Sequence, residues 1–284
     1  SPVMRGEDIL ISEDQYKQQV RGTMLILWNV YNFFVTYANL DNWDPKEFQI
    51  SNFKFQISNA TVLDEWILSL LNQLTQNVTK SLESYDTVGA IDVVKSFVTD
   101  FSTWYIRRSR DRVGPSAEDE ADKQAFYETT HTVLTTVTKL IAPITPFISE
   151  EIYRNLTGEE SVHLADWPEA DASAINKDLD QQMHSARELA SIILMRRKIA
   201  GVKVRMPIKK LSYRGVELNP EILQIVLDEV NVEELAYAGE SQSGASVESG
   251  GDNPNELTNP ENQNILLGQA REIVRKIQEE RKKL

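Results

Sequence analysis

The stretch 97–112, FVTDFSTWYIRRSRDR, joins an apolar helical pattern to an abrupt run of cations. Through it and just before it, apolar side chains recur at spacings of three and four residues, which predicts one buried face of an α-helix. These side chains are Ile91, Val94, Val98, Phe101 and Tyr105. The cations that follow are Arg107, Arg108, Arg110 and Arg112. The stretch therefore predicts a helix that packs along one side and ends in a cationic cluster beside Trp104.

Two interpretations of this cluster are open. Arginine and aromatic planes suit stacking on unpaired bases and pairing with phosphates, so the cluster could bind RNA. Alternatively it is an exposed helix end, where arginine complements the negative end of the helix dipole. In either case we expect Phe101 and Tyr105 to pack in the core, and Trp104 with the arginines to face outward.

Helical periods recur on both sides of this stretch, separated by short joins. The expected helices cover about 13–39, 61–82, 86–112, 116–142 and 146–156. Thr61 with Asp64 matches a capping box, Asp86 can cap the next helix, and Pro146 suits a first helical position. Because no strand pattern interrupts these helices, they predict an antiparallel helical bundle over 13–160.

The second half has a different pattern and predicts a small α+β module over 161–238. We expect a helix over about 176–200, a strand near 207–213, a short helix over 220–230 and a strand near 232–237. Residues 239–264 are rich in Gly, Ser, Asn and Glu and predict a flexible loop. Residues 265–284 predict a terminal helix that packs on this module. The expected fold class is therefore mostly α.

Composition restricts the possible partners and chemistry. The chain has 284 residues, a net charge of −13 and no cysteine, which excludes disulfides, thiol nucleophiles and cysteine-bound zinc. No stretch approaches the roughly 20 apolar residues of a membrane span, so we expect a soluble protein without a membrane partner. The negative charge also argues against a general polyanion binder, so DNA is not an expected partner.

Residues 195–214, MRRKIAGVKVRMPIKKLSYR, nevertheless form a second basic run without any acid. Alternation in VKVR would place Lys203 and Arg205 on one face of an extended segment, where they could follow a phosphate backbone. The alternative is the exposed face of an ordinary strand. The candidate RNA-binding residues of this run are Arg196, Arg197, Lys198, Lys203 and Arg205.

The sequence carries no recognisable catalytic pattern. It has no phosphate-binding GxxxxGK[ST], no GxGxxG, no HExxH and no GxSxG. Its histidines, His131, His163 and His184, are far apart, and none has a second ligand at metal spacing. We therefore expect no catalytic residue, no metal site and no cofactor in this chain.

An ordered series of segments resembles the class I aminoacyl-tRNA synthetases, most closely their isoleucine branch. LWNVYNFFVTYANLD, LDEWILSLLN, FSTWYIRRSRDR, LIAPITPFISEEIYRNL and SVHLADWPEAD resemble the helices and the exit of the anticodon-binding bundle. RRKIAGVKVRMPIKKL, LDEVNVEEL and QAREIVRKIQEERKKL are similar to the module that follows in the isoleucine branch. Glu65, where a basic residue is usual, and Val113-Gly114, where an aromatic pair is usual, depart from the pattern.

This resemblance implies a fragment of a ligase. The HIGH and KMSKS signatures and the editing domain do not occur in the chain, and residues 1–12 look like the linker that leaves the catalytic part. The implied parent is a monomeric cytoplasmic enzyme that joins isoleucine to tRNA(Ile) with ATP and magnesium. The fragment would hold the anticodon stem and loop and would adjoin the catalytic domain of its own chain. The same region of a valine or leucine enzyme, or a helical protein–protein scaffold, is the alternative.

Overall fold

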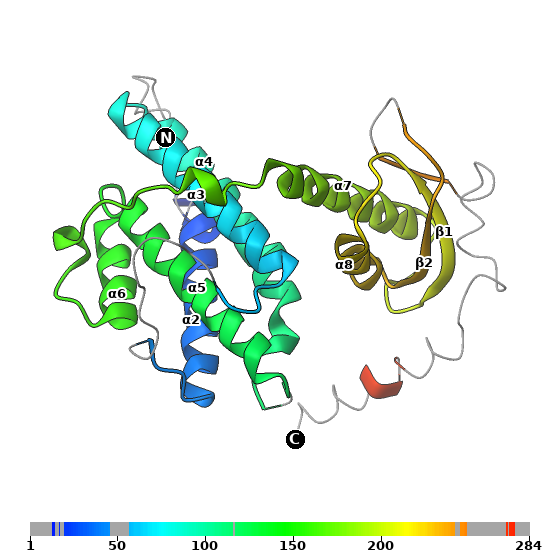
Figure 1. The fold of residues 1–284 in the computed structure, drawn as a ribbon, viewed down its shortest axis with the longest axis horizontal. Coiled ribbons are helices and arrows are strands. Elements are labelled where there is room, and N and C mark those ends of the chain that lie inside the picture. Colours follow the sequence, from blue (N-terminus) through cyan, green and yellow to red (C-terminus); the bar gives the residue numbers. More distant parts are fainter. Residues whose placement is uncertain are drawn as a thin grey trace. The chain divides into compact units, whose positions relative to one another are not determined.

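The chain forms two compact units, Ser1–Lys177 and Asp178–Leu284 (Figure 1). The structure is a computed structural model that describes residues 13–14, 17, 20–45, 57–115, 117–241, 245–248, 271 and 273–275. The expectation for residues 1–12 falls outside the described part of the chain. None of the helices in that part has an apolar stretch long enough to cross a membrane.

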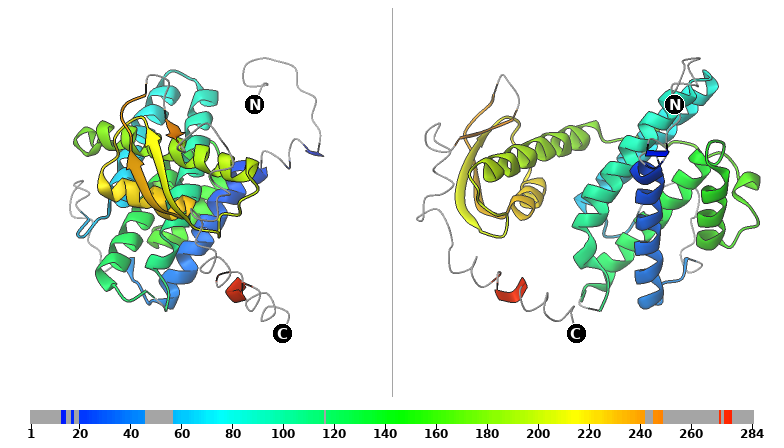
Figure 2. Two further views of the ribbon diagram at one scale, coloured as in Figure 1. Left: turned by 90° about the vertical axis from the view of Figure 1, so that its right-hand side faces the viewer. Right: turned by 180° about the vertical axis from the view of Figure 1, so that it is seen from behind.

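The first unit is a bundle of α-helices, as the sequence predicts. Its long helices are α2 (Leu25–Leu40), α3 (Val62–Glu83), α4 (Thr87–Asp100), α5 (Glu120–Ile141) and α6 (Pro146–Thr157). Shorter turns are η2 (Val20–Met24), η4 (Phe101–Ile106), η5 (Arg110–Arg112), η6 (Val162–Leu164) and η7 (Ala172–Ala174). Figure 2 shows α2, α3, α4 and α5 lying side by side, with α6 packed against α5.

Local capping explains where these helices begin. Thr61 accepts a hydrogen bond from the Asp64 backbone while the Asp64 side chain accepts one from the Thr61 backbone, which completes the predicted capping box. Asp86 accepts from the amide of Gly89 at the start of α4. Pro146 occupies the first turn of α6, where its missing N–H removes no helical hydrogen bond.

Helix α5 is the centre of the bundle. Its middle is buried on nearly all sides, and it contacts α2, α3 and α6. An aromatic series connects it to α4 and η4, with centroid separations of 6.0 Å for Phe97–Phe101, 5.7 Å for Phe101–Tyr105 and 5.9 Å for Tyr105–Phe126. Phe101 and Tyr105 are fully buried, as the apolar period predicts.

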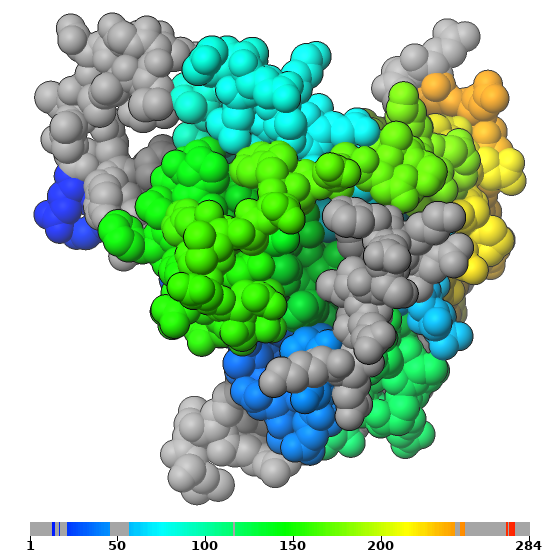
Figure 3. Space-filling view, turned by 60° about the vertical axis from the view of Figure 1, so that its left-hand side comes forward, coloured from blue at the N-terminus to red at the C-terminus, as the bar shows by residue number. Residues whose placement is uncertain are grey.

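The connector 161–177 packs on the first unit through side-chain hydrogen bonds from α3. The amides of Asp171 and Asn176 donate to Asn72 Oδ1 and Ser69 Oγ at 2.8 and 2.9 Å. The Trp167 indole donates to Thr79 Oγ1 at 2.9 Å. The space-filling view shows α6 and part of this connector, in green, on one face of the unit (Figure 3).

The part of the second unit described up to residue 248 contains two longer helices and a sheet. Its elements are α7 (Lys177–Ile199), β1 (Ile208–Arg214), α8 (Pro220–Val230), β2 (Val232–Tyr237) and β3 (Ser246–Glu248). The strand order is β2-β1-β3, with β1 parallel to β2 and antiparallel to β3. Helix α8 makes the crossover that a parallel β1–β2 pair requires.

Strand β3 is a finding that the sequence does not predict. It lies within 239–264, where the composition predicts a flexible loop, and it pairs Val247 with Tyr213 of β1. Three residues between Gly- and Ser-rich segments are too short to show a strand period. The rest of this segment is described only at 239–241 and 245. Of the expected terminal helix, Arg271 and 273–275 are described, and they are helical.

Candidate nucleic-acid interface

The first candidate surface is the end of the helix that carries 97–112. Here the backbone departs from the expected α-helix and forms a π-helical turn over Phe101–Ile106, in which the Arg107 amide donates to the carbonyl of Ser102. π-helical turns are rare in proteins, and those that occur are often found at functional sites. Within this turn Phe101 and Tyr105 are buried and Trp104 is half-buried.

Three of the four predicted arginines of this surface reach solvent. Arg107 is exposed, and its Nε donates to the Thr103 carbonyl one turn earlier at 2.8 Å. Arg108 is half-buried, and Arg110 is exposed at the start of η5. Together with Trp104 they form what we call the helix-end cluster: Trp104, Arg107, Arg108 and Arg110. The cluster brings arginines close in sequence to an aromatic side chain, a combination that suits single-stranded RNA.

Arg112 is a correction to the predicted set. Its side chain is 11% exposed and forms ion pairs of 2.7 Å with both Asp64 and Asp122. All of its N–H groups are used, because Nε binds Asp122, Nη1 binds Asp64 and Ser109, and Nη2 binds Asp64 and the Asp122 carbonyl. Its guanidinium also lies 5.7 Å from the ring centroid of Phe126. Arg112 therefore holds the bundle together and has no donor left for RNA.

Asp64 is the residue around which this packing is organised. Its fully buried carboxylate accepts from the Tyr105 hydroxyl at 2.6 Å and from the Thr61 amide at 2.8 Å, in addition to Arg112. Burial alone would raise the pKa of Asp64, but the hydrogen bonds and charge of Arg112, with Tyr105 and Thr61, lower it below its ordinary value. The carboxylate thus stays ionised at neutral pH.

The sequence indicates only part of this arrangement. The Thr61–Asp64 spacing reveals the cap, yet Arg112 lies 48 residues away and nothing local connects the two. The one available signal is that Arg112 ends the basic run, two residues beyond Arg110 and next to Val113, which is buried.

The second candidate surface lies in the second unit, where α7 ends. Lys198 and Lys203 are exposed, and Arg196 and Arg205 are half-buried. Residues 202–207 form a turn rather than the expected extended segment, because the Met206 amide donates to the Lys203 carbonyl at 2.9 Å. The prediction that Lys203 and Arg205 share one face of a strand is therefore wrong.

Arg197 is a second correction. It is 1% exposed, and its guanidinium donates to the carbonyls of Lys203, Met206 and Asn231. A side chain buried in this way cannot contact RNA directly. The outward-facing residues of this run, which we call the loop cluster, are Arg196, Lys198, Lys203 and Arg205.

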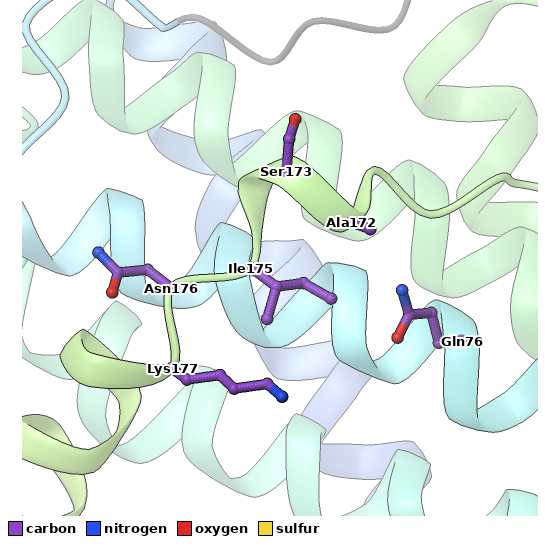
Figure 4. A pocket seen from close by; sticks show the side chains of 6 residues that line it. All are labelled: Gln76, Ala172, Ser173, Ile175, Asn176 and Lys177. Carbon is purple, nitrogen blue, oxygen red and sulfur yellow. The ribbon is translucent and has the colours of Figure 1, made fainter.

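An open pocket of about 610 Å³ lies on the first unit between the connector and α3 (Figure 4). It is lined by Gln76, Ala172, Ser173, Ile175, Asn176 and Lys177. None of these side chains is a carboxylate or an imidazole, so the pocket offers no acid–base pair for catalysis.

The described residues form a helical bundle with exposed arginines at one helix end, and a small α+β module. A family model described as "Anticodon-binding domain of tRNA ligase" matches residues 64–212. Since this match covers more than half of the chain, the chain belongs to the family of anticodon-binding domains of tRNA ligases.

Its curated relatives have a more specific name. The isoleucine–tRNA ligases of two Dehalococcoides mccartyi strains, CBDB1 and ATCC BAA-2266, are 37% and 38% identical over 95% of this chain. The isoleucine–tRNA ligase of Streptomyces avermitilis is 40% identical over 79%. The chain spans 28%, 28% and 21% of these relatives, which is about a quarter of their length.

Proposed function

We propose that this chain is the region of an isoleucine–tRNA ligase that binds the anticodon stem and loop of tRNA(Ile). The observation that carries the proposal is the helix-end cluster, which places exposed arginines and a half-buried tryptophan at the end of a helix within the matched family domain. The names of the relatives support isoleucine as the amino acid.

The residues of the helix-end cluster would make different contacts with the RNA. Trp104 would stack on an unpaired anticodon base, because stacking on aromatic rings is how proteins commonly hold splayed bases. Arg107, Arg108 and Arg110 would bind phosphates or base edges, since a guanidinium can donate two parallel hydrogen bonds to either. The loop cluster would contact the RNA backbone.

The chemistry of the parent enzyme belongs to the same proposal. The parent would attach isoleucine to tRNA(Ile) with ATP and magnesium, which act in a catalytic domain outside this chain. We further propose a cytoplasmic monomer, with residues 1–12 as the link to that domain. The division of the chain is also a proposal: a bundle over 13–160, a small module over 161–238, a segment over 239–264 that contains β3, and a terminal helix over 265–284.

The test is binding of tRNA(Ile) to the full chain, measured by gel shift at fixed salt. Replacing Arg107 and Arg110 by alanine is expected to weaken binding by 1–3 kcal/mol for a base-specific contact and by less for phosphates alone. The control is Arg154→Ala, which removes one positive charge from an exposed position on α6, so it is compared with each single variant, Arg107→Ala and Arg110→Ala.

Three results would contradict the proposal. Unchanged affinity of the double variant would show that the helix-end cluster does not contact the tRNA. Equal affinity for tRNA(Val) or tRNA(Leu) would exclude the isoleucine assignment. An affinity that does not depend on salt would favour a protein–protein scaffold, because RNA binding releases counterions and weakens as salt rises.

A further inference from the structure

The loop 202–207 follows α7 and carries two members of the loop cluster, Lys203 and Arg205. It begins after Gly201, which has φ of 69° and ends the helix in the left-handed conformation that glycine favours. It ends where Ile208 enters β1, with the Ile208 amide donating to the Asn231 carbonyl at 3.1 Å. Both ends of the loop are therefore fixed by regular structure.

The guanidinium of Arg197 lies beneath this loop and binds its backbone. Nη1 donates to the carbonyls of Lys203 at 3.2 Å and Met206 at 2.8 Å, and Nη2 donates to the Asn231 carbonyl at 2.7 Å. Asn231 adds a bond of its own, from Nδ2 to the Val204 carbonyl at 2.7 Å. Two loop carbonyls, those of Lys203 and Met206, thus point toward the buried guanidinium, and the carbonyl of Val204 is held by Asn231 near the surface.

This arrangement has an electrostatic consequence at the loop surface. Carbonyl oxygens carry partial negative charge and repel an approaching anion, and here those of Lys203 and Met206 are bound by the buried guanidinium. The side chains of Lys198 and Lys203 are exposed. The loop therefore combines exposed cations with carbonyls that already have donors, which suits a phosphate.

The partners of Arg197 are also unlike those of an ordinary buried ion pair. In the described part of the chain no carboxylate pairs with it, and burial lowers its pKa to about 10. A buried cation held by carbonyls alone is expensive to maintain, so a neutral side chain of similar size would serve a purely space-filling role better. Its planar fork donates from two separate nitrogens, to the loop and to Asn231, whereas the donors of an ammonium all radiate from one nitrogen.

We propose that Arg197 is a positioning residue that preorganises loop 202–207 as a phosphate-binding element for the backbone of the bound tRNA. This inference rests on the proposed function. In it, the buried Arg197 orients Lys203 and the neighbouring loop residues. Preorganisation strengthens binding because the loop loses little conformational freedom when the phosphate arrives.

The experiment is a double-mutant cycle on the full chain, with tRNA(Ile) transcript as the probe and affinity measured over a range of salt concentrations. Lys203→Ala removes an outward charge and is expected to weaken binding about 3- to 10-fold and to lower the salt slope by about one. Arg197→Lys keeps a cation but has one donating nitrogen in place of Nη1 and Nη2, so it cannot reach both the loop carbonyls and the Asn231 carbonyl, and it is expected to weaken binding at least as much.

The decisive result is how the two changes combine. If Arg197 acts through the loop, the double variant should bind within about twofold of the weaker single variant, because a displaced loop has already lost the Lys203 contact. Fully multiplicative losses would overturn the proposal, as would an Arg197→Lys variant with unchanged affinity. The control uses Lys209, an exposed lysine on β1, in place of Lys203 in the same cycle. The losses from Lys209→Ala and Arg197→Lys should multiply, because Lys209 lies outside the loop.

Two further variants keep the test decisive. If Arg197→Lys fails to fold by circular dichroism, Asn231→Gly replaces it, because glycine accepts the φ of 52° at this position and removes only the side-chain bonds of Asn231. It should couple to Lys203→Ala in the same way, and additive losses would again overturn the proposal. If Arg107→Ala weakens binding while the loop variants do not, this inference fails and the proposed function stands; if none of them weakens binding, both fail.

Discussion

Arg112 in the first unit and Arg197 in the second both come from basic runs, and both are buried, yet their partners differ. Arg112 binds the carboxylates of Asp64 and Asp122, whereas Arg197 binds three backbone carbonyls. The first arrangement joins side chains of α3, η5 and α5. The second fixes the course of one loop. The position of an arginine within a basic run therefore does not determine whether it binds a ligand, a carboxylate or main-chain carbonyls.

The difference also predicts unequal energetics. Removing Asp64 would leave Arg112 with one carboxylate partner, Asp122, and would take an acceptor from Tyr105 and Thr61, which costs more than the loss of a single neutral hydrogen bond. Two of the three carbonyls bound by Arg197 have another donor, since Lys203 O accepts from Met206 and Asn231 O accepts from Ile208. Only the Met206 carbonyl depends on Arg197 among these contacts.

The largest effect is expected for Asp64→Ala. It removes the fully buried carboxylate opposite Arg112 and should lower the unfolding free energy of the first unit by about 3–5 kcal/mol. Urea unfolding of the full chain, followed by tryptophan fluorescence, measures it. The matched control is Asp122→Ala, whose side chain is 29% exposed and should matter less. Equal losses at the two positions would contradict a network centred on Asp64.

Acid should weaken the first unit through the same carboxylate. The pKa of Asp64 is lower in the folded chain than its ordinary value of about 4. Its contribution to stability is therefore complete above that ordinary value and is lost as pH falls through the lower folded-state value. Unfolding measured from pH 6 to pH 2 should show a shallower acid loss for Asp64→Asn than for the natural chain, whereas Arg197→Met should leave the acid loss of the first unit unchanged.

An intermediate effect is expected for Arg197→Met. The change fills similar space but leaves the Met206 carbonyl without the donor shown here, so a loss of about 1–3 kcal/mol is expected in the second unit. Thermal unfolding followed by circular dichroism measures it. A loss as large as that of Asp64→Ala would show that the carbonyl-bound arginine is as critical as the carboxylate-bound one.

The smallest effect is expected for a matched pair of glycines, Gly158 after α6 and Gly201 after α7. Their φ values are 72° and 69°, and an added Cβ would meet nothing within 4 Å at either site. Alanine should therefore cost about 1–2 kcal/mol at both, through backbone strain alone. Affinity for tRNA(Ile) should fall only for Gly201→Ala, because only Gly201 leads into loop 202–207. Equal affinities of the Gly158→Ala and Gly201→Ala variants for tRNA(Ile) would show that the loop does not contribute to binding.

Much of the fold was predictable because local signals determine it. The Thr61 capping box, the Asp86 cap and Pro146 each act within one helical turn, and each is confirmed. Parallel pairing of β1 with β2 and the short strand β3 were not predictable, because pairing depends on residues far apart in the chain. The π-helical turn is likewise absent from the periodic pattern.

The candidate site was less predictable than the fold. The sequence indicates where cations gather, but it cannot say which of them find buried partners. Arg112 and Arg107 look equivalent in the run, and a carboxylate 48 residues away separates their roles. Arg197 was misassigned because its partners are main-chain carbonyls, which every sequence contains and no residue pattern marks.

The π-helical turn at Phe101–Ile106 has a consequence for insertions and deletions. One residue more or less rotates everything that follows in an α-helix by about 100° relative to what precedes it. Upstream, Phe97 and Phe101 continue the aromatic stack, and downstream the chain presents Arg107 and Arg110. The π-helical turn takes up one extra residue, so a one-residue deletion within it would restore regular helix and leave both faces in place. The same deletion elsewhere in α4 would rotate one face against the other, so chain length should be less restricted at this turn than in the rest of the helix.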